Sequence, residues 1–454
     1  MGQVSILAAG TERIECFIDE PFRTRTVVDM PSSACLLRVS GADGNKYCRG
    51  LDIFTYLRQR LVDNHLSGDF PMRFVGGFIG AFGYGLRNLC CPRGKATVTS
   101  FQWRECTNAA SWEGDADMGG REPDASFVYC PRAIVYHHDS GEAWVLSILP
   151  NDQTWVREYA RAIDSPIATL PPPVVSIMES LVPVLSQAAY CRRVNQCIAH
   201  LRQGDSYEIC LTTLCKSPSC ISDAWNFYRR MRTHNPAPFS AFFPLNSSST
   251  LCCTSPERFL SVHGRKVESR PIKGTQPRAT SVASDERLAE ELARSVKDRA
   301  ENMMIVDLTR NDVSRVCKVG SVSVPQMMLV ESYAVHQLVS AVVGELEEEN
   351  HAVDAVRAVF PPPSMTGAPK LKTMQLIDDL EDSPRGVYSG VLGYFSFIGD
   401  ADFDVIIRSA LVGSKGVVVG AGGAVTVLSD PQGEYDEMLL KVQTLGSPKN
   451  ERAD

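Results

Sequence analysis

Three consecutive segments near the C-terminus decide the fold class: GVYSGVLGYFSF (residues 386–397), FDVIIRSALV (403–412) and GVVVGAGGAVTVL (416–428). Each is rich in β-branched and aromatic residues, and Gly, Asp or Ser separates it from the next, which predicts three strands. Residues 206–214 and 249–254 have the same character. The chain is therefore predicted to be rich in strands over its C-terminal two thirds.

Helices are predicted between these strands. Residues 186–202 form one candidate, and residues 284–308 form a longer one because four apolar residues recur there at helical spacing. A shorter helix is expected over residues 370–380, with Pro369 at its start, where proline is tolerated. The pattern therefore predicts a mixed chain in which strands and helices alternate.

Three consecutive prolines at residues 171–173 favour an extended connector. The strand-like pieces 126–136 and 143–149 precede it. We therefore expect an N-terminal region over residues 1–170 and a C-terminal region over residues 180–447.

The composition is that of an ordinary globular protein. The chain has 454 residues, of which 44% are hydrophobic and 22% charged, and its formal net charge is -7. A mildly acidic chain offers no general attraction to nucleic acid or to an anionic membrane, so an anion must be bound by a local site or a metal. The uncharged run 74–86 is far shorter than the ~20 residues that a membrane-spanning helix needs. Neither nucleic acid nor membrane is therefore a predicted partner.

Two pairs of acidic residues have the spacing of a shared helix face. Asp298 and Glu301 form one pair, and Glu434 and Glu437 form the other. Two such faces that meet would offer oxygen ligands suited to Mg²⁺. The alternative, which the spacing alone favours, is that both pairs are solvated surface charge.

A lysine in an apolar setting is the next candidate. Lys273 lies between Ile272 and Gly274 in the segment RPIKGT (270–275). Removal from water lowers the pKa of a lysine and makes it a nucleophile or base. A surface lysine in a turn is the alternative.

Two further segments are suited to binding anions through backbone N–H groups. SMTGAPK (364–370) opens a predicted helix, whose first N–H groups bind carboxylate or phosphate, although an ordinary capped helix start is equally favoured. GAGGA (420–424) is followed by a strand and not by a helix, so dinucleotide binding is rejected. A glycine-rich bend of this kind can still present N–H groups to an anion.

Together, these segments resemble the chorismate-utilising synthases. The matching segments, in chain order, are GDSYE (204–208), SPERF (255–259), RPIKGT (270–275), DRAENMMIVDLTRND (298–312), LVS (338–340), SMTGAPK (364–370), GYF (393–395), IRS (407–409), GAGG (420–423) and EYDE (434–437). The resemblance runs from about residue 185 to 445 and extends more faintly to residues 76–84. It implies an α+β fold like that of anthranilate synthase component I, in which two large, mainly antiparallel sheets pack face to face with helices outside.

Within the family, RPIKGT resembles the aminodeoxychorismate synthases, which carry lysine where anthranilate synthases carry alanine. Glu208 stands where isochorismate and salicylate synthases place a water-activating lysine, which speaks against water as the nucleophile. The resemblance implies that Glu257 is the general acid on the departing C4 hydroxyl of chorismate and that Lys273 attacks C2. Ammonia then attacks C4 and expels the lysine, giving 4-amino-4-deoxychorismate for 4-aminobenzoate and folate formation. Such a mechanism requires a neutral Lys273 and a protonated Glu257.

The resemblance also implies a ligand set for Mg²⁺ and for chorismate. The metal ligands are expected to be Glu301 and Glu437, with Asp298 and Glu434 acting through water. The substrate-binding residues are expected to be Tyr394, Arg408, Gly422 and Gly423 at the enolpyruvyl carboxylate, and Ser364, Thr366 and Gly367 on the opposite side.

Three positions depart from the family pattern: Gln337 replaces a histidine of anthranilate synthases, Ala424 a glycine, and Leu428 an aspartate. Anthranilate synthase component I and a catalytically inactive chorismate-binding regulatory subunit therefore remain alternatives. No glutaminase signature is present, so ammonia is expected from solution or from a glutamine amidotransferase partner. A cytoplasmic location is expected, with a plastid as the alternative if a transit peptide is missing from this chain.

Overall fold

The computed structural model describes residues 4–19, 35–90, 104–105, 121–165, 181–219, 221–332 and 335–446. The proline connector and the predicted boundary between residues 170 and 180 lie outside these ranges. In the described part of the chain, no helix is long and apolar enough to cross a membrane.

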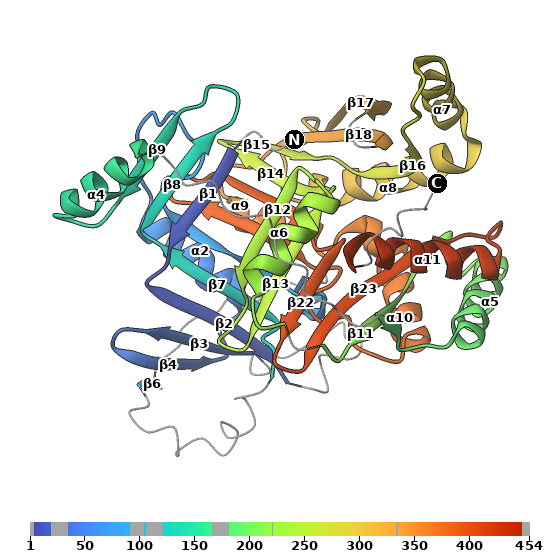
Figure 1. Cartoon of the computed structure of the whole chain (residues 1–454), viewed down its shortest axis with the longest axis horizontal. Coiled ribbons are helices and arrows are strands. Elements are labelled where there is room, and N and C mark those ends of the chain that lie inside the picture. The colour runs from blue at the N-terminus through green and yellow to red at the C-terminus, as the bar shows by residue number, and fades with distance from the viewer. Residues whose placement is uncertain are drawn as a thin grey trace.

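Two large sheets form the body of the molecule (Figure 1), and their paired strands run antiparallel. In the described residues the larger sheet has thirteen strands, in the order β16-β18-β15-β14-β21-β20-β5-β7-β2-β3-β4-β6, with β17 also paired to β18. Its strands are β2 (Glu12–Ile18), β3 (Cys35–Gly41), β4 (Gly44–Arg49), β5 (Gly77–Phe82), β6 (Arg104–Glu105), β7 (Ala125–Cys130), β14 (Arg258–His263), β15 (Lys266–Ser269), β16 (Ile272–Pro277), β17 (Ser323–Ser332), β18 (Val335–Glu345), β20 (Val391–Ser396) and β21 (Ala401–Val405). The prediction of an α+β fold with large antiparallel sheets is confirmed.

The second sheet supplies the other wall of the core. It has seven strands in the described residues, in the order β10-β11-β23-β22-β13-β12, with β19 paired to β11. Its strands are β10 (Val182–Pro183), β11 (Glu208–Ser217), β12 (Phe239–Pro244), β13 (Ser249–Ser255), β19 (Gly367–Ala368), β22 (Ser409–Gly413) and β23 (Gly416–Val425). A small third sheet consists of β1 (Val4–Ala9), β8 (Arg132–His137) and β9 (Ala143–Ser147).

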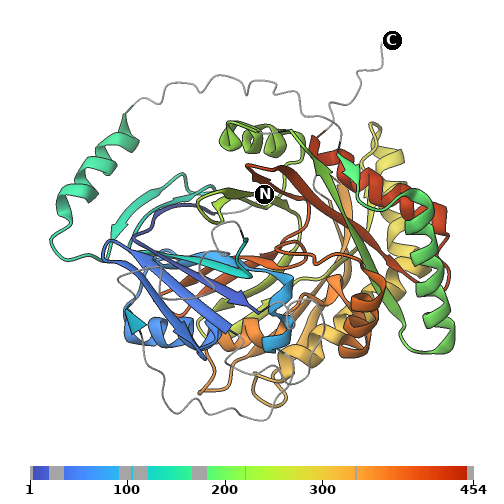
Figure 2. The ribbon, with the colours of Figure 1, turned by 90° about the horizontal axis from the view of Figure 1, so that it is seen from below.

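Most helices cover the outer faces of the two large sheets, and one, Gln153–Asp164, packs on β9 of the small sheet (Figure 2). They are α2 (Ile53–Asp63), α3 (Arg87–Cys90), α4 (Gln153–Asp164), α5 (Gln187–Gln203), α6 (Ala224–His234), α7 (Val282–Arg294), α8 (Val296–Ser314), α9 (Ala352–Val359), α10 (Lys370–Leu380) and α11 (Pro431–Gly446), with short 3₁₀ turns η2 (Tyr84–Leu86) and η5 (Pro363–Met365). The apolar faces of α5, α10 and α11 pack on β11 and β23 in one cluster that contains Tyr190, Ile377 and Met438. A second cluster, with Phe54, Phe82 and Val356, joins α2 and α9 to the larger sheet.

Strands from both ends of the chain share the larger sheet. β5 pairs with β20 over six residues, from Gly77 opposite Ser396 to Phe82 opposite Val391. An aromatic cluster that includes Phe82, Phe127, Phe395 and Phe403 lies across this junction, with ring centroids 4.6 Å apart for Phe82 and Phe127. The N-terminal strands are therefore an integral part of the sheet that carries β16 and β20.

Two sequence predictions were wrong about where elements end. The helix predicted over 284–308 is two helices, α7 and α8, because the backbone of Ser295 is extended and its hydroxyl caps α8 by accepting from Asp298 N. The strand predicted over 403–412 is β21 of one sheet and β22 of the other, and Arg408 between them has a φ of 50°. The helix predicted over 370–380 is confirmed.

Candidate active site

Lys273 and Glu208 meet where the two sheets approach each other. Lys273 is on β16 of the larger sheet and Glu208 is the first residue of β11 in the smaller one. Lys273 Nζ donates to Glu208 Oε1 at 2.7 Å, and the two side chains are only 10% and 1% exposed. This ion pair is therefore almost wholly removed from water.

A bulge in β16 sets the position of Lys273. The ladder to β18 shifts between Lys273 opposite Leu338 and Thr275 opposite Gln337, and Gly274 inside the bulge has a φ of 78°. A Cβ on Gly274 would lie 2.8 Å from Asp298 Oδ1. Glycine is needed here for both reasons, and the bulge brings Lys273 next to the first turn of α8.

The expected lowering of the lysine pKa is wrong for this structure. Burial by itself lowers the pKa of Lys273, but the carboxylates of Glu208 and Glu301 outweigh burial, and the net shift is upward. The sequence shows the apolar neighbours of Lys273 in the chain, whereas Glu208 is 65 residues away and only the fold brings it near. Lys273 therefore rests as an ammonium ion.

Glu257 is a buried acid close to this pair. It lies in the connection between β13 and β14, where its carbonyl accepts from Val405 N at 3.0 Å and its side chain is buried. Burial raises the pKa of Glu257 to about 7, although the Ser364 hydroxyl and the charge of Lys273 act in the opposite direction. A carboxyl with this pKa can hold a proton near neutral pH, as a general acid must.

The acidic pairs on α8 and α11 share one electrostatic environment. Burial acts to raise the pKa values of Glu301, Glu434 and Glu437, and the charge of Lys297 acts on all three in the opposite direction, as does Lys273 on Glu301 and Glu437. Burial raises the pKa of Glu301 to about 7. Burial also raises the pKa of Glu434.

Glu437 differs from its neighbours because Lys441 Nζ lies 2.6 Å away. Burial raises the pKa of Glu437, but the ammonium group outweighs it and the net shift is downward. Glu437 is therefore the most readily ionised of these glutamates.

The carboxylates fit a divalent cation without forming a closed ligand set. Glu301 Oε1 and Glu434 Oε2 are buried and have no hydrogen-bond partner in the described part of the chain. No group of three or more His, Cys, Asp or Glu side chains in that part is arranged to hold a metal ion. Buried carboxylate oxygens without donors need a counter-charge, and this need is the observation that fits Mg²⁺ here.

Gly422 and Gly423 lie inside β23 and not at a bend between strands. A Cβ on Gly422 would lie 2.1 Å from Leu211 O, and one on Gly423 would lie 2.7 Å from Glu434 Oε2. The ladder between β22 and β23 ends at Ala410 opposite Val419, whereas the ladder to β11 continues to Val425. Among the described strands, nothing pairs with the β22 side of β23 from Gly420 onward, which leaves backbone groups there for a ligand.

The segment SMTGAPK leads into the predicted helix, but only its last residue is helical. It forms η5 and the two-residue strand β19, and α10 begins only at Lys370 after Pro369. Gly367 in β19 has a φ of 144° and lies so close to β11 that a Cβ would meet Glu208 O at 1.9 Å. Thr366 is fully buried and its carbonyl accepts from Cys210 N at 2.8 Å. Ser364 Oγ is buried and makes no hydrogen bond of ordinary geometry to any described residue.

Arg408 lies at the strained turn between the sheets. Its left-handed backbone is fixed because Thr254 donates to Arg408 O through Oγ1 at 2.8 Å. Burial lowers its pKa, and the charges of Tyr388 and Glu437 oppose that shift. Strained backbone held by its surroundings is common at functional sites.

The charge of Tyr388 acts on the pKa of Arg408, whereas Tyr394 is not among the groups that shift it. The Tyr394 ring packs edge-on against Phe74 at 5.2 Å, and the strongest charges acting on it are those of Asp402 and Arg73. The prediction for Tyr394 assumed that a tyrosine in the strand faces the site, whereas Tyr388 lies in the turn before β20. The sequence gives no sign of this turn. In the structure, Ser389 after Tyr388 has a φ of 64°, and its N–H donates to Ile406 O at 3.0 Å.

The departures from the family pattern occupy different settings. Gln337 lies opposite Thr275 in the ladder, and the side chain of the neighbouring His336 binds Asp285 and Ser332. Ala424 lies opposite Cys210 inside the β11–β23 ladder. Leu428 is 81% exposed.

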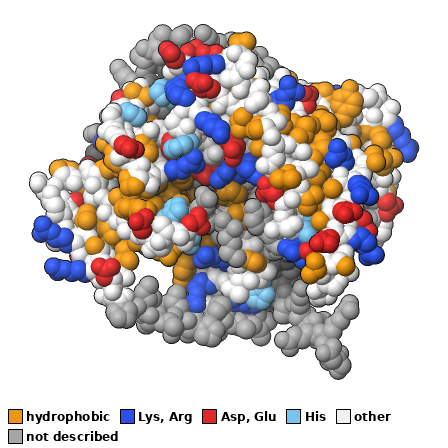
Figure 3. Space-filling model, turned by 90° about the horizontal axis from the view of Figure 1, so that it is seen from above, with side chains coloured by type: hydrophobic (Ala, Val, Ile, Leu, Met, Phe, Trp, Pro, Cys, Tyr) orange, Lys and Arg blue, Asp and Glu red, His pale blue; other side chains and the backbone are white. Residues whose placement is uncertain are grey.

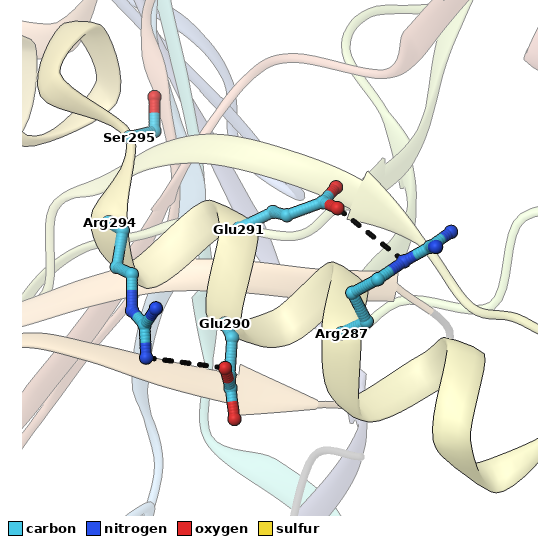
Figure 4. Close-up of a pocket in the computed structure, with 5 residues that line it drawn as sticks. All are labelled: Arg287, Glu290, Glu291, Arg294 and Ser295. Atoms are coloured by element: carbon cyan, nitrogen blue, oxygen red, sulfur yellow. Dashed lines mark ion pairs between the residues drawn. The ribbon is translucent and has the colours of Figure 1, made fainter.

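Other surface features do not coincide with this site. The pocket in Figure 4 is lined by Arg287, Glu290, Glu291, Arg294 and Ser295, none of which was predicted as a site residue. On the face seen in Figure 3, acidic and basic side chains are interspersed.

Comparison with known proteins gives a consistent set of relatives. The family described as chorismate binding enzyme matches residues 91–447. An aminodeoxychorismate synthase of Streptomyces pristinaespiralis is 39% identical over 434 residues, which cover 90% of this chain and 56% of that protein. Aminodeoxychorismate synthase component 1 of Salmonella typhimurium is 32% identical and covers 96% of this chain and 89% of its own length.

Among solved structures, anthranilate synthase component I of Streptococcus pneumoniae superposes with a TM-score of 0.76 at 25% identity, covering 98% of this chain and 92% of that one. This match confirms the predicted type of fold. The chain spans about half the length of the first curated relatives it matches.

Proposed function

Because the chain belongs to the chorismate-binding enzyme family, we propose that it is an aminodeoxychorismate synthase, which converts chorismate and ammonia to 4-amino-4-deoxychorismate. The observation that carries the proposal is the buried ion pair of Lys273 and Glu208, whose lysine charge also acts on the pKa of the buried Glu257 carboxyl. A nucleophilic lysine and a proton-holding acid are the two groups that amination through a lysine intermediate requires.

The site residues divide the reaction between them. Glu257, with its pKa near 7, gives a proton to the departing C4 hydroxyl. Lys273 attacks C2 and forms a covalent intermediate, and ammonia then attacks C4 and releases the lysine. The product amine transfers its extra proton to Glu257, which restores the acid for the next turnover.

The substrate is proposed to be held by its two carboxylates. Arg408 and Tyr388 bind the enolpyruvyl carboxylate together with backbone N–H groups at Gly422 and Gly423, and Ser364, Thr366 and Gly367 line the opposite side. Glu301 and Glu437, with Asp298 and Glu434 through water, would hold Mg²⁺, whose charge would neutralise the ring carboxylate. The buried oxygens of Glu301 and Glu434, which have no hydrogen-bond partner in the described part of the chain, support this assignment.

Ammonia is proposed to come from a glutamine amidotransferase, as a separate subunit or as part of a longer polypeptide. The name component 1 of the Salmonella relative implies a partner component for that protein. The reaction would supply 4-aminobenzoate for folate formation in the cytoplasm, or in a plastid if the complete protein carries a transit peptide.

One assay tests the proposal. The chain is incubated with chorismate, a magnesium salt and an ammonium salt, and the product is identified by mass and by its conversion to 4-aminobenzoate with a lyase. Lys273→Ala should abolish product. Formation of anthranilate, no consumption of chorismate, or normal turnover by Lys273→Ala would each refute the assignment.

A further inference from the structure

Glu208 is held rigidly with one carboxylate oxygen unused. Its backbone is fixed because Ser206 Oγ donates to Glu208 O at 2.9 Å and because β11 pairs with β19 at Glu208 opposite Ala368. Oε1 accepts from Lys273, while Oε2 is buried and has no partner in the described part of the chain. The carboxylate is therefore a fixed acceptor with spare capacity next to one particular lysine.

The resting charge of Lys273 creates a chemical problem. An ammonium nitrogen has no lone pair, so Lys273 must lose a proton before it attacks. Its side chain is 10% exposed, so bulk water is a poor acceptor. A proton acceptor inside the site is needed.

Few groups near Lys273 can take this proton. Those whose charges interact with it are Glu208, Cys210, Glu257, Glu301 and Glu437. Burial raises the pKa of the Cys210 thiol, Glu257 is needed as an acid, and Glu301 and Glu437 are assigned to the cation. Among the described residues, only Glu208 is within hydrogen-bond distance of Nζ, at 2.7 Å.

We propose that Glu208 is the general base that takes a proton from Lys273 Nζ as this nitrogen attacks the substrate, and returns it when the lysine is released. The inference rests on the proposed function, since it deepens the role of the same site. The inference goes beyond the proposed function because it gives Glu208 a chemical role in addition to a structural one.

Every proton that Glu208 or Glu257 gains or loses is returned within one turnover. Glu208 accepts one proton from the ammonium group, and the neutral amine uses its lone pair to form the bond to C2. The ring double bonds C1=C2 and C5=C6 shift to C1=C6 and C4=C5, and the C4 hydroxyl departs with the proton of Glu257 as water. After ammonia has bonded to C4, the C2–nitrogen bond breaks, the lysine leaves as a neutral amine, and Glu208 protonates it again.

The test measures formation of the covalent intermediate directly. The chain is mixed with chorismate and a magnesium salt without ammonia, quenched in acid at timed intervals, and assayed by intact mass for an adduct of chorismate minus water on Lys273. Glu208→Gln keeps the size of the side chain and removes the base. Adduct formation should be slower by roughly 100-fold or more near neutral pH, as is typical for loss of a general base.

The pH dependence separates a base from a structural role. In Glu208→Gln the lysine must lose its proton to solvent, so the ratio of wild-type to variant rate should fall about tenfold for each pH unit below the pKa that Lys273 has in the variant, which is lower than in the wild type because the Glu208 charge is gone. Using the ratio removes the effect of Glu257, which is the same in both proteins. A loss that is equal at every pH, or no loss at all, would overturn the proposal.

Two further variants guard against misfolding. Glu208→Asp retains a carboxylate and should show a smaller loss with the wild-type pH profile, so a Gln-like profile for Glu208→Asp would count against the base. Asp312→Asn removes the partner of another buried lysine, Lys370, at 2.8 Å, and should leave the profile unchanged. Absence of adduct and of product in the wild-type chain would refute the proposed function itself, which is a different result from failure of Glu208.

Discussion

Lys297 Nζ lies 3.9 Å from Glu301 Oε1, one turn further along α8. The ammonium group lowers the pKa of Glu301 against the effect of burial, and it acts in the same sense on Glu434. A side-chain cation therefore provides part of the counter-charge at the carboxylates that we assign to Mg²⁺.

Removing this lysine should strengthen metal binding. In Lys297→Ala the carboxylates lose a competing cation, and because Lys297 is half exposed, the gain should be modest, about 0.5–1 kcal/mol or roughly two- to fivefold. The half-saturating magnesium concentration in the chorismate amination assay should fall by that factor. An unchanged or higher requirement for magnesium would contradict the competition.

The rate should fall as pH rises through the pKa of Glu257. Its acid form dominates below about pH 7, so kcat should decline about tenfold for each pH unit well above that value. In Glu257→Gln the rate should drop by roughly 10²–10⁴ and this alkaline limb should disappear. If the alkaline limb persists in the variant, another group must be the acid.

The same carboxyl should affect folding. A carboxyl whose pKa is raised from 4.5 to about 7 in the folded state holds its proton more tightly there than in the unfolded chain. Its contribution to stability is therefore full below about pH 4.5 and is lost as pH rises through 7, at a cost of about 3 kcal/mol. Urea unfolding of wild type and Glu257→Gln should show the wild type losing this amount relative to the variant between about pH 4.5 and 8. Parallel pH dependences would rule the shift out.

Arg385 and Glu381 form the buried ion pair that ties the substrate segment to β11. Arg385 donates to Glu381 Oε1 and to Met365 O, both at 2.7 Å, and the two side chains are 2% and 8% exposed. Arg385→Met leaves a buried carboxylate without its cation and should cost about 3–5 kcal/mol of unfolding free energy. Arg294→Ala removes an exposed partner of Glu290 (Figure 4) and should cost less than about 1 kcal/mol. Equal effects of the two substitutions would contradict this ranking.

Tyr388 and Tyr394 allow a matched comparison. Because the charge of Tyr388 acts on Arg408, we expect both to bind the same carboxylate, and Tyr388→Phe should raise KM for chorismate roughly tenfold, the value of one hydrogen bond to a charged group. Tyr394→Phe removes the same atom from a ring that packs on Phe74 and should leave KM near its wild-type value. The reverse order would restore the original prediction for Tyr394.

The local sequence pattern predicted which helices and strands form more accurately than it predicted where they begin and end. The helix over 370–380 was predicted at both ends, since Pro369 before Lys370 fixes its start. The break at Ser295 was missed because apolar residues at helical spacing continue across it, while the capping bond that divides the helices involves a single hydroxyl. The separation of β21 from β22 depends on the left-handed backbone of Arg408, which cannot be predicted from its being an arginine.

The candidate site residues were selected from motifs, and the motifs carried no information about the electrostatics around them. Residue type and order selected Lys273, Glu257 and the acidic pairs. The charge state of Lys273 depends on Glu208, and the pKa of Arg408 depends in part on the charge of Tyr388. In each case the two residues belong to different segments of the chain. Such contacts exist only after the sheets have packed.

The β5–β20 pairing limits how the protein can be shortened. A chain that begins after the proline connector would keep the motifs from residue 204 onward but lose β5, and the β20 backbone groups that pair with β5 would be exposed at the edge of the sheet. The aromatic side chains of Phe395 and Phe403 would lose Phe82 and Phe127 as neighbours. The C-terminal region is therefore expected to aggregate when expressed alone, because the N-terminal strands cover an edge and a face that would otherwise be exposed.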